Sequence, residues 1–142
     1  PNLEGQGTIT MRDLVKNCLR MRPERIIVGE VRGGEALDLI KVWGTGHPGG
    51  IATIHAGSAL GALLRLEQLI LEVAVNPPRA LVAEAVNVVI HIAGRGQRRR
   101  IESIARVVGF DRGGYRLADA LEPSPPELPL SSSSPNHPGE LS

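Results

Sequence analysis

Apolar residues in the first part of the chain follow the spacing of an amphipathic helix, recurring at Met11, Leu14, Val15, Cys18 and Leu19. Thr10 and Asp13 form a T-x-x-D capping box at the start of this pattern. The residue before a proline avoids the α region, so Pro23 limits the other end. The pattern therefore predicts a helix that begins after Thr10 and ends before Pro23.

Two short apolar runs on either side of a second helical pattern predict a strand–helix–strand unit. We expect a strand over Arg25 to Gly29, a helix over Glu35 to Trp43 and a strand over Gly50 to His55. The first run is an unbroken Ile-Ile-Val, which predicts burial on both faces of a parallel sheet. Strand–helix–strand units of this kind are almost always right-handed.

The second half of the chain predicts two helices and then strands. Ser58 is expected to cap a helix to about Val75, whose apolar face comprises Leu60, Leu63, Leu64, Ile70 and Leu71. Pro77 and Pro78 predict the start of a helix that reaches about Val86. A strand pair is expected over Asn87–Ala93 and Arg99–Gly109, with a short strand near Tyr115–Leu117.

Composition favours one folded domain followed by a tail. The 142 residues are enough for about one domain, and 42% of them are hydrophobic. We place the domain at 1–121, and residues 122–142 form a Pro/Ser-rich segment that we expect to be disordered. The single cysteine, Cys18, excludes an intrachain disulfide and is typical of a reducing cytoplasm. No apolar run reaches the ~18 residues that span a bilayer.

Candidate chemistry lies just after each predicted strand of the unit, where open α/β sheets place their ligands. Glu30 follows the first strand. A carboxylate in this position can hold Mg²⁺, often through water, or orient an attacking water in phosphoryl transfer. The alternative is a structural ion pair with Arg32 or Arg25.

The residues after Glu30 are candidates for contact with a phosphate. Arg32 can clamp a phosphate or pair with Glu35, and Gly33 permits close approach of the backbone to a ligand. His55 ends the second strand, and His47 and Thr45 lie in the loop before it. These histidines can hydrogen-bond a γ-phosphate or be structural, and their spacing does not fit a zinc site.

Basic residues elsewhere carry less specific signals. Four arginines lie between Arg95 and Arg100, a pattern that fits nucleic acid, anionic lipid or a solvated turn. The solvated turn is the favoured interpretation, and the absence of interleaved aromatic residues argues against a platform on which single-stranded nucleic acid stacks. Direct binding of nucleic acid is therefore not expected.

Two long stretches resemble the type II/IV secretion ATPase family. L-R-M-R-P-E-R-I-I-V-G-E-V-R-G-G-E-A-L-D-L resembles its Walker B region, and T-G-H-P-G-G-I-A-T-I-H-A resembles its histidine box. The resemblance covers roughly Pro1 to Ala120 and is closest to TrbB-type conjugal-transfer ATPases. The amino-terminal segment P-N-L-E-G-Q-G-T-I-T-M-R-D-L-V-K-N is more similar to the CpaF branch.

The resemblance implies a RecA-like P-loop NTPase core that uses ATP and Mg²⁺. Glu30 would be the Walker B glutamate, His47 and His55 the histidine box, and Arg32 the arginine after the glutamate. The family implies a homohexamer at the cytoplasmic face of the inner membrane, with peripheral membrane association. Its partners would be proteins of the secretion, conjugation or pilus apparatus.

Parts of the family pattern are missing from these 142 residues. No stretch reads G-x-x-x-x-G-K-[ST], and the Asp-box strand and the family's amino-terminal domain are also absent. The chain begins at Pro1 rather than Met, so we expect the carboxyl part of a longer protein or a truncated copy. We therefore expect no ATP hydrolysis by this chain alone. The alternatives are a catalytically dead fragment or a ring-interaction module.

Overall fold

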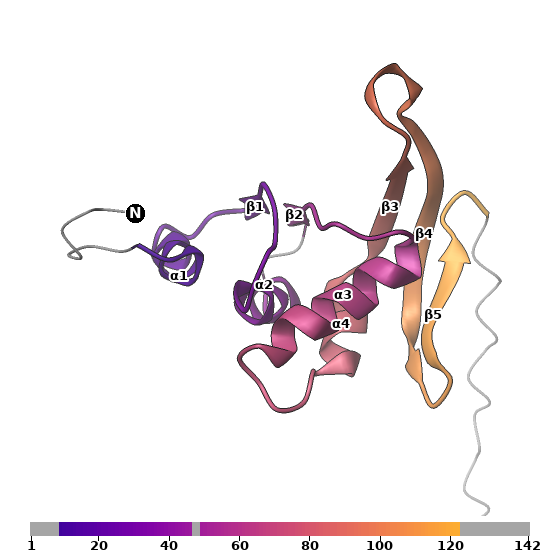
Figure 1. Cartoon of the computed structure of the whole chain (residues 1–142). Coiled ribbons are helices and arrows are strands. Elements are labelled where there is room, and N and C mark those ends of the chain that lie inside the picture. The colour runs from indigo at the N-terminus through magenta and orange to yellow at the C-terminus, as the bar shows by residue number, and fades with distance from the viewer. Residues whose placement is uncertain (1–8, 47–48, 123–142) are drawn as a thin grey trace, which may run out of the picture.

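Two separate sheets flank a group of helices in the computed structural model, which describes residues 9–46 and 49–122 (Figure 1). A two-stranded parallel sheet, β1–β2, lies in the first half of the chain. A three-stranded antiparallel sheet, in the order β3–β4–β5, lies in the second half. Helix α2 packs against both α3 and α4, and α3 and α4 contact the antiparallel sheet.

The first helix, α1 (Met11–Arg20), begins and ends as its sequence predicts. The Thr10 hydroxyl accepts from the Asp13 backbone N–H at 3.1 Å, and the Asp13 carboxylate accepts from the Thr10 N–H at 3.1 Å. This reciprocal pair satisfies two amides that the first helical turn leaves free. Arg12 of α1 donates to Asp38 and so ties α1 to the next helix.

The predicted strand–helix–strand unit is confirmed as β1 (Ile27–Val28), α2 (Glu35–Gly44) and β2 (Ile51–Ala52). The strands pair in parallel, Ile27 with Ile51 and Val28 with Ala52, and are shorter than expected. The predicted burial on both faces is wrong. Ile27 is 69% exposed and Ile51 is 59% exposed, because the described elements cover only the face that carries Val28.

The two following helices are α3 (Ala59–Leu71) and α4 (Arg79–Ala85). The Ser58 hydroxyl caps α3 by accepting from the Gly61 N–H at 3.0 Å, as predicted. Helix α3 ends four residues earlier than expected, and its buried face differs from the prediction. Its fully buried side chains are Leu63, Leu69 and Ile70, whereas Leu60, Leu64 and Leu71 are exposed.

The antiparallel sheet comprises β3 (Val88–Ala93), β4 (Arg100–Asp111) and β5 (Gly114–Asp119), with a 3₁₀ turn at Gly96–Arg98. The expected strand pair and third strand are confirmed, although β4 and β5 are longer than expected. Gly94 has φ +86°, and a Cβ there would lie 2.2 Å from the Arg98 carbonyl oxygen. Glycine is therefore required where β3 enters this turn.

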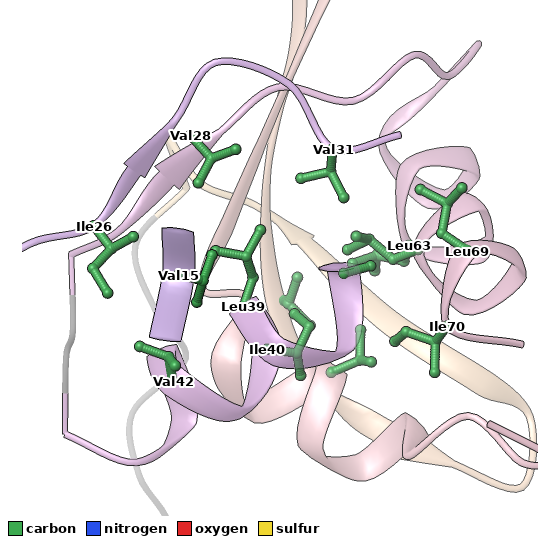
Figure 2. Close-up of a cluster of buried hydrophobic side chains, with 14 residues drawn as sticks. Val15, Ile26, Val28, Val31, Leu39, Ile40, Val42, Leu63, Leu69 and Ile70 are labelled. Atoms are coloured by element: carbon green, nitrogen blue, oxygen red, sulfur yellow. The ribbon is translucent and has the colours of Figure 1, made fainter. Parts of the chain in front are cut away.

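The core is aliphatic and centres on α2 and α3 (Figure 2). Leu39 and Ile40 of α2 and Leu63, Leu69 and Ile70 of α3 belong to this cluster, and all five are essentially inaccessible to solvent. Trp43 at the end of α2 packs against the backbone of Gly50, where a Cβ would lie 2.0 Å from the indole nitrogen. This contact sets the position of the chain entering β2 relative to α2.

One ionisable group lies within this packing. Glu67 of α3 is 7% exposed and accepts a hydrogen bond from Arg79 Nε of α4 at 2.9 Å. No helix within 9–46 and 49–122 has the length and apolar character needed to cross a bilayer. The expected Pro/Ser-rich tail lies outside the described residues from position 123 onward.

Candidate active site

Glu30 and His55 lie side by side because each follows one strand of the parallel pair. Beyond β1 and β2 the two segments remain connected. The Val31 N–H donates to the Thr53 carbonyl at 2.9 Å, and the Thr53 hydroxyl donates to the Gly29 carbonyl. The strand ends therefore hold both side chains at one edge of the sheet, as the sequence predicts.

The Glu30 carboxylate contacts two cationic or titratable side chains, His55 and Arg32. His55 Nε2 lies 2.8 Å from Glu30 Oε1, and Arg32 Nε donates to Glu30 Oε2 at 2.6 Å. Arg32 Nη2 also contacts the same carboxylate. Glu30 is mostly covered, with a side-chain exposure of 21%, whereas the Arg32 and His55 side chains are open to solvent.

The charges of this trio keep the glutamate ionised. The hydrogen bond from Arg32 lowers the pKa of Glu30 most, against the opposing effect of desolvation, and the charges of Arg32 and His55 lower it further. The same pair raises the pKa of Arg32. An ionised carboxylate only accepts hydrogen bonds, so the His55 nitrogen that faces it carries the proton.

A second carboxylate shapes the turn that carries Arg32. Glu35 Oε1 accepts from the backbone N–H of Arg32 at 2.8 Å and from that of Gly33 at 3.0 Å. Because Glu35 binds the backbone, the Arg32 side chain pairs with Glu30 instead of with Glu35. The expected alternative of an Arg32–Glu35 pair is therefore wrong, whereas the structural alternative for Glu30, an ion pair with Arg32, is present.

The Gly33-Gly34 pair permits close packing inside the protein. A Cβ on Gly34 would lie 2.3 Å from Val73 Cγ1, and one on Gly33 would lie 3.1 Å from the Glu35 carboxylate. The turn thus fits tightly between the start of α2 and the residues that follow α3. Contact of Gly33 with a nucleotide stays a prediction.

A cleft of about 360 Å³ opens beside the trio. Its lining comprises Glu30, Val31, Arg32, Ile54, His55 and Arg65. Arg65 belongs to α3 and was not among the residues predicted from the sequence. Its sequence signal is weak: it is a single cation in an otherwise apolar helical stretch, G-A-L-L-R-L, which by itself indicates only a solvated side chain.

The structure does not bring Thr45 next to Glu30. The Thr45 hydroxyl donates to the Lys41 carbonyl at 2.6 Å, at the carboxyl end of α2. The turn at Arg32 precedes the other end of this ten-residue helix, about 15 Å away. His47 lies outside the described residues, so its predicted role and that of Thr45 stay predictions.

The trio provides one carboxylate for a cation. No cluster of three or more His, Cys, Asp or Glu side chains suited to a metal occurs within 9–46 and 49–122. Mg²⁺ keeps several waters and takes few protein carboxylates when phosphates supply other ligands. A role of Glu30 in holding Mg²⁺ therefore stays a prediction.

Comparison with known proteins identifies the family to which the chain belongs. The model of the family described as "Type II/IV secretion system protein" matches residues 1–103. The chain belongs to this family. Within it, the chain is similar to the conjugal transfer protein TrbB of Rhizobium radiobacter, with 44% identity over 115 residues, covering 81% of this chain and 36% of TrbB.

Two further relatives belong to type IV secretion systems. PtlH of Bordetella pertussis is 38% identical over 107 residues, covering 69% of this chain and 32% of PtlH. The crystal structure of the VirB11 ATPase of the Brucella suis type IV secretion system, in complex with sulphate, matches with a TM-score of 0.62. That match has 35% identity and covers 69% of this chain and 32% of VirB11.

These matches confirm an α/β, ATPase-like fold and a TrbB-like sequence over part of the chain. The chain spans about a third of the length of these relatives. The similarity of its amino-terminal segment to the CpaF branch stays a prediction.

Proposed function

We propose that this chain supplies the Walker B and histidine-box part of an ATPase site in a motor for conjugal transfer or type IV secretion. The position of Glu30 beside His55, at the ends of two parallel strands, carries the proposal. The family membership and the similarity to the VirB11 ATPase support it. ATP with Mg²⁺ is the proposed substrate.

Glu30 would act as an ionised carboxylate, as its lowered pKa favours. In that state it would contact a water of the nucleotide-bound Mg²⁺ or orient the attacking water. His55 would sense the γ-phosphate from the solvent-exposed side of the same carboxylate. Arg32, Gly33, Thr45 and His47 remain proposed nucleotide-binding residues.

The wider assembly is also part of this proposal. A homohexameric ring at the cytoplasmic face of the inner membrane would couple hydrolysis to proteins of the secretion or conjugation apparatus. The 142 residues contain no phosphate-cradling G-x-x-x-x-G-K-[ST] motif, so this site requires phosphate contacts from elsewhere. A catalytically dead fragment or a ring-interaction module is the alternative, and sequence upstream of Pro1 distinguishes them.

A chimera tests the proposed chemistry. The aligned third of Brucella suis VirB11 ATPase is replaced by the matching segment of this chain, and Mg²⁺-dependent ATP hydrolysis is measured. We expect the chimera to hydrolyse ATP and Glu30→Gln to lower kcat at least ~100-fold, because it removes a charge that acts on the reacting groups. Nucleotide affinity should change little.

Glu24→Gln is the matched control, because it makes the same change on an exposed residue six positions upstream. Its kcat should equal that of the unmodified chimera. Equal turnover of the Glu30→Gln and unmodified chimeras would contradict the proposed role. A folded chimera that binds nucleotide but never hydrolyses it would favour the dead-fragment alternative.

A further inference from the structure

Arg65 lies in the wall of the cleft that α3 provides, whereas Glu30, Arg32 and His55 come from the strand ends. Helix α3 is fixed on this side by its Ser58 cap and by the burial of Leu63 and Ile70. The guanidinium is therefore carried into the cleft by an element that is independent of the Glu30 turn.

The charges around the cleft do not balance. Arg32 and His55 both contact Glu30, so the single carboxylate of the lining is already paired. Arg65 Nη1 donates to Gln68 Oε1 at 3.1 Å, and Gln68 is neutral. Within the described ranges, Arg65 has no carboxylate within ion-pair distance, which leaves one uncompensated guanidinium beside an exposed imidazole.

The shape of this group fits an oxyanion. Arginine presents a planar set of donors that matches phosphate and carboxylate oxygens, and its hydrogen bonds to anions are about twice as strong as those between neutral groups. The Gln68 amide holds one edge of the guanidinium and so reduces its freedom. A volume of about 360 Å³ suits a small ligand or one phosphoryl part of a larger ligand.

We propose that Arg65 is an anion-binding residue that contacts a phosphate oxygen of the ligand in this cleft, beside the Glu30–His55 pair. The proposal rests on the proposed function, since it assigns the phosphoryl group of that substrate to the Arg65 side of the cleft. Gln68 is then a positioning residue, which acts through the guanidinium and does not itself contact the anion.

Orthophosphate titrated into the 142-residue chain at low ionic strength provides the test, with the ³¹P line width as the signal. We expect saturable broadening with the wild-type chain and at least a tenfold weaker affinity for Arg65→Gln. Arg65→Lys should be intermediate, because it keeps the charge and loses the planar set of donors. Gln68→Ala should weaken binding less than Arg65→Gln.

Arg99→Gln is the matched control, because it removes the same charge from an exposed residue in the β3–β4 turn. Its affinity should equal that of the wild type, and circular dichroism should show that each variant is folded. If Arg65→Gln does not fold, the phosphate affinity of Arg65→Lys is compared with that of Arg99→Gln, and a weaker affinity of Arg65→Lys supports the proposal. Equal affinity of the wild type and the folded Arg65 variants, or the absence of saturable binding by the wild type, would overturn the proposal.

This test is separate from that of the proposed function. Phosphate binding by the chain requires no turnover, and turnover of the VirB11 chimera requires no binding by the isolated chain. If the Glu30→Gln chimera is inactive but Arg65→Gln binds phosphate as the wild type does, the proposed function is supported and the role of Arg65 in anion binding is contradicted. If Arg65→Gln loses phosphate binding but Glu30→Gln does not change turnover of the chimera, the role of Arg65 in anion binding is supported and the proposed function is contradicted.

Discussion

Glu35 is the residue that fixes the backbone turn next to Glu30. By accepting two backbone N–H groups at the turn, it determines where the Arg32 backbone lies, and hence where the guanidinium can reach. Burial is the largest single effect on the pKa of Glu35, and it raises this pKa. Hydrogen bonds from the backbone of Arg32, Glu35 and Gly33 together lower the pKa by more than burial raises it. The net pKa is below the ordinary value.

This lowered pKa gives a stability prediction with a defined pH dependence. Glu35→Ala should reduce the free energy of unfolding by about 1–2 kcal/mol at neutral pH, because it leaves the turn amides without their acceptor. The contribution of Glu35 is complete above the ordinary carboxyl pKa of 4.5 and is lost as the pH falls through the lowered value in the folded state.

Urea unfolding of wild type and variant across this range measures the effect, and the two curves should converge in acid. Glu24→Ala, on an exposed site, controls for loss of a surface charge. A pH-independent difference between wild type and Glu35→Ala would show that the carboxylate charge is not responsible.

Gly34 gives a second prediction at the residue scale. Gly34→Ala should destabilise the protein by about 1–3 kcal/mol, because the new methyl group would lie 2.3 Å from Val73 Cγ1. Thermal unfolding is the measurement, and Gly57→Ala is the control, since nothing lies within 4 Å of its Cβ position. The second change Val73→Ala should recover part of the loss if the clash is the cause.

At the scale of elements, the partly buried pair Glu67–Arg79 connects α3 to α4 and, through Arg79 and Phe110, to the antiparallel sheet. The Arg79 guanidinium lies 5.9 Å from the centre of the Phe110 ring, and Phe110 packs edge-on against Tyr115. Burial raises the pKa of the Tyr115 hydroxyl most, and the neighbouring Glu67 carboxylate raises it further. This hydroxyl has no hydrogen-bond partner in the described part of the chain.

Breaking the pair should loosen this junction. Arg79→Met should lower the free energy of unfolding by about 2 kcal/mol. This is less than the effect of removing one partner from a fully buried ion pair, because Arg79 itself is half exposed. Glu67→Gln in the same chain should restore most of the stability by removing the unpaired charge. Chemical unfolding of the single and double variants measures both effects, and additive losses would contradict the coupling.

The same scale shows what local sequence can and cannot predict. The caps at Thr10 and Ser58 involve residues three apart, so the sequence alone identifies them. Glu30 and His55 were also predicted to meet, because parallel strands end at one edge. The buried face of α3 was predicted only in part: Leu63 and Ile70 are buried as expected, whereas Leu60 is exposed, because leucines share one chemistry and only tertiary packing selects among them. Arg65 was missed for the same reason.

At the scale of the whole molecule, one face of the parallel sheet is apolar and uncovered by the described elements. Ile27 and Ile51 are paired across β1 and β2 and are both exposed. Short strands with an open edge and apolar side chains favour pairing between chains. We therefore expect the isolated chain to self-associate.

Sedimentation velocity tests this expectation. Changing Ile27→Thr and Ile51→Thr together should shift the population toward monomer while keeping β-branched residues in the strands. Val75→Thr, in an exposed loop position, controls for the general effect of lower hydrophobicity. A wild-type chain that is monomeric over the whole concentration range would contradict the prediction.

The catalytic prediction also belongs to the whole molecule. The isolated chain should hydrolyse no ATP above background, because the roles proposed for Glu30 and His55 require a nucleotide whose phosphates are already held. Coupled-enzyme measurement of ADP release with and without Mg²⁺ is the assay. Magnesium-dependent turnover that disappears with Glu30→Gln would show that the cleft is sufficient by itself.

The packing of Trp43 on Gly50 has a practical consequence. Trp43 is the only tryptophan in the sequence, and its indole ring rests on the backbone that leads into β2 and then to His55. Its fluorescence therefore comes from a single position at the junction of α2 and β2. Emission from this one indole provides an intrinsic optical signal for whether the His55 segment is docked, without any attached dye.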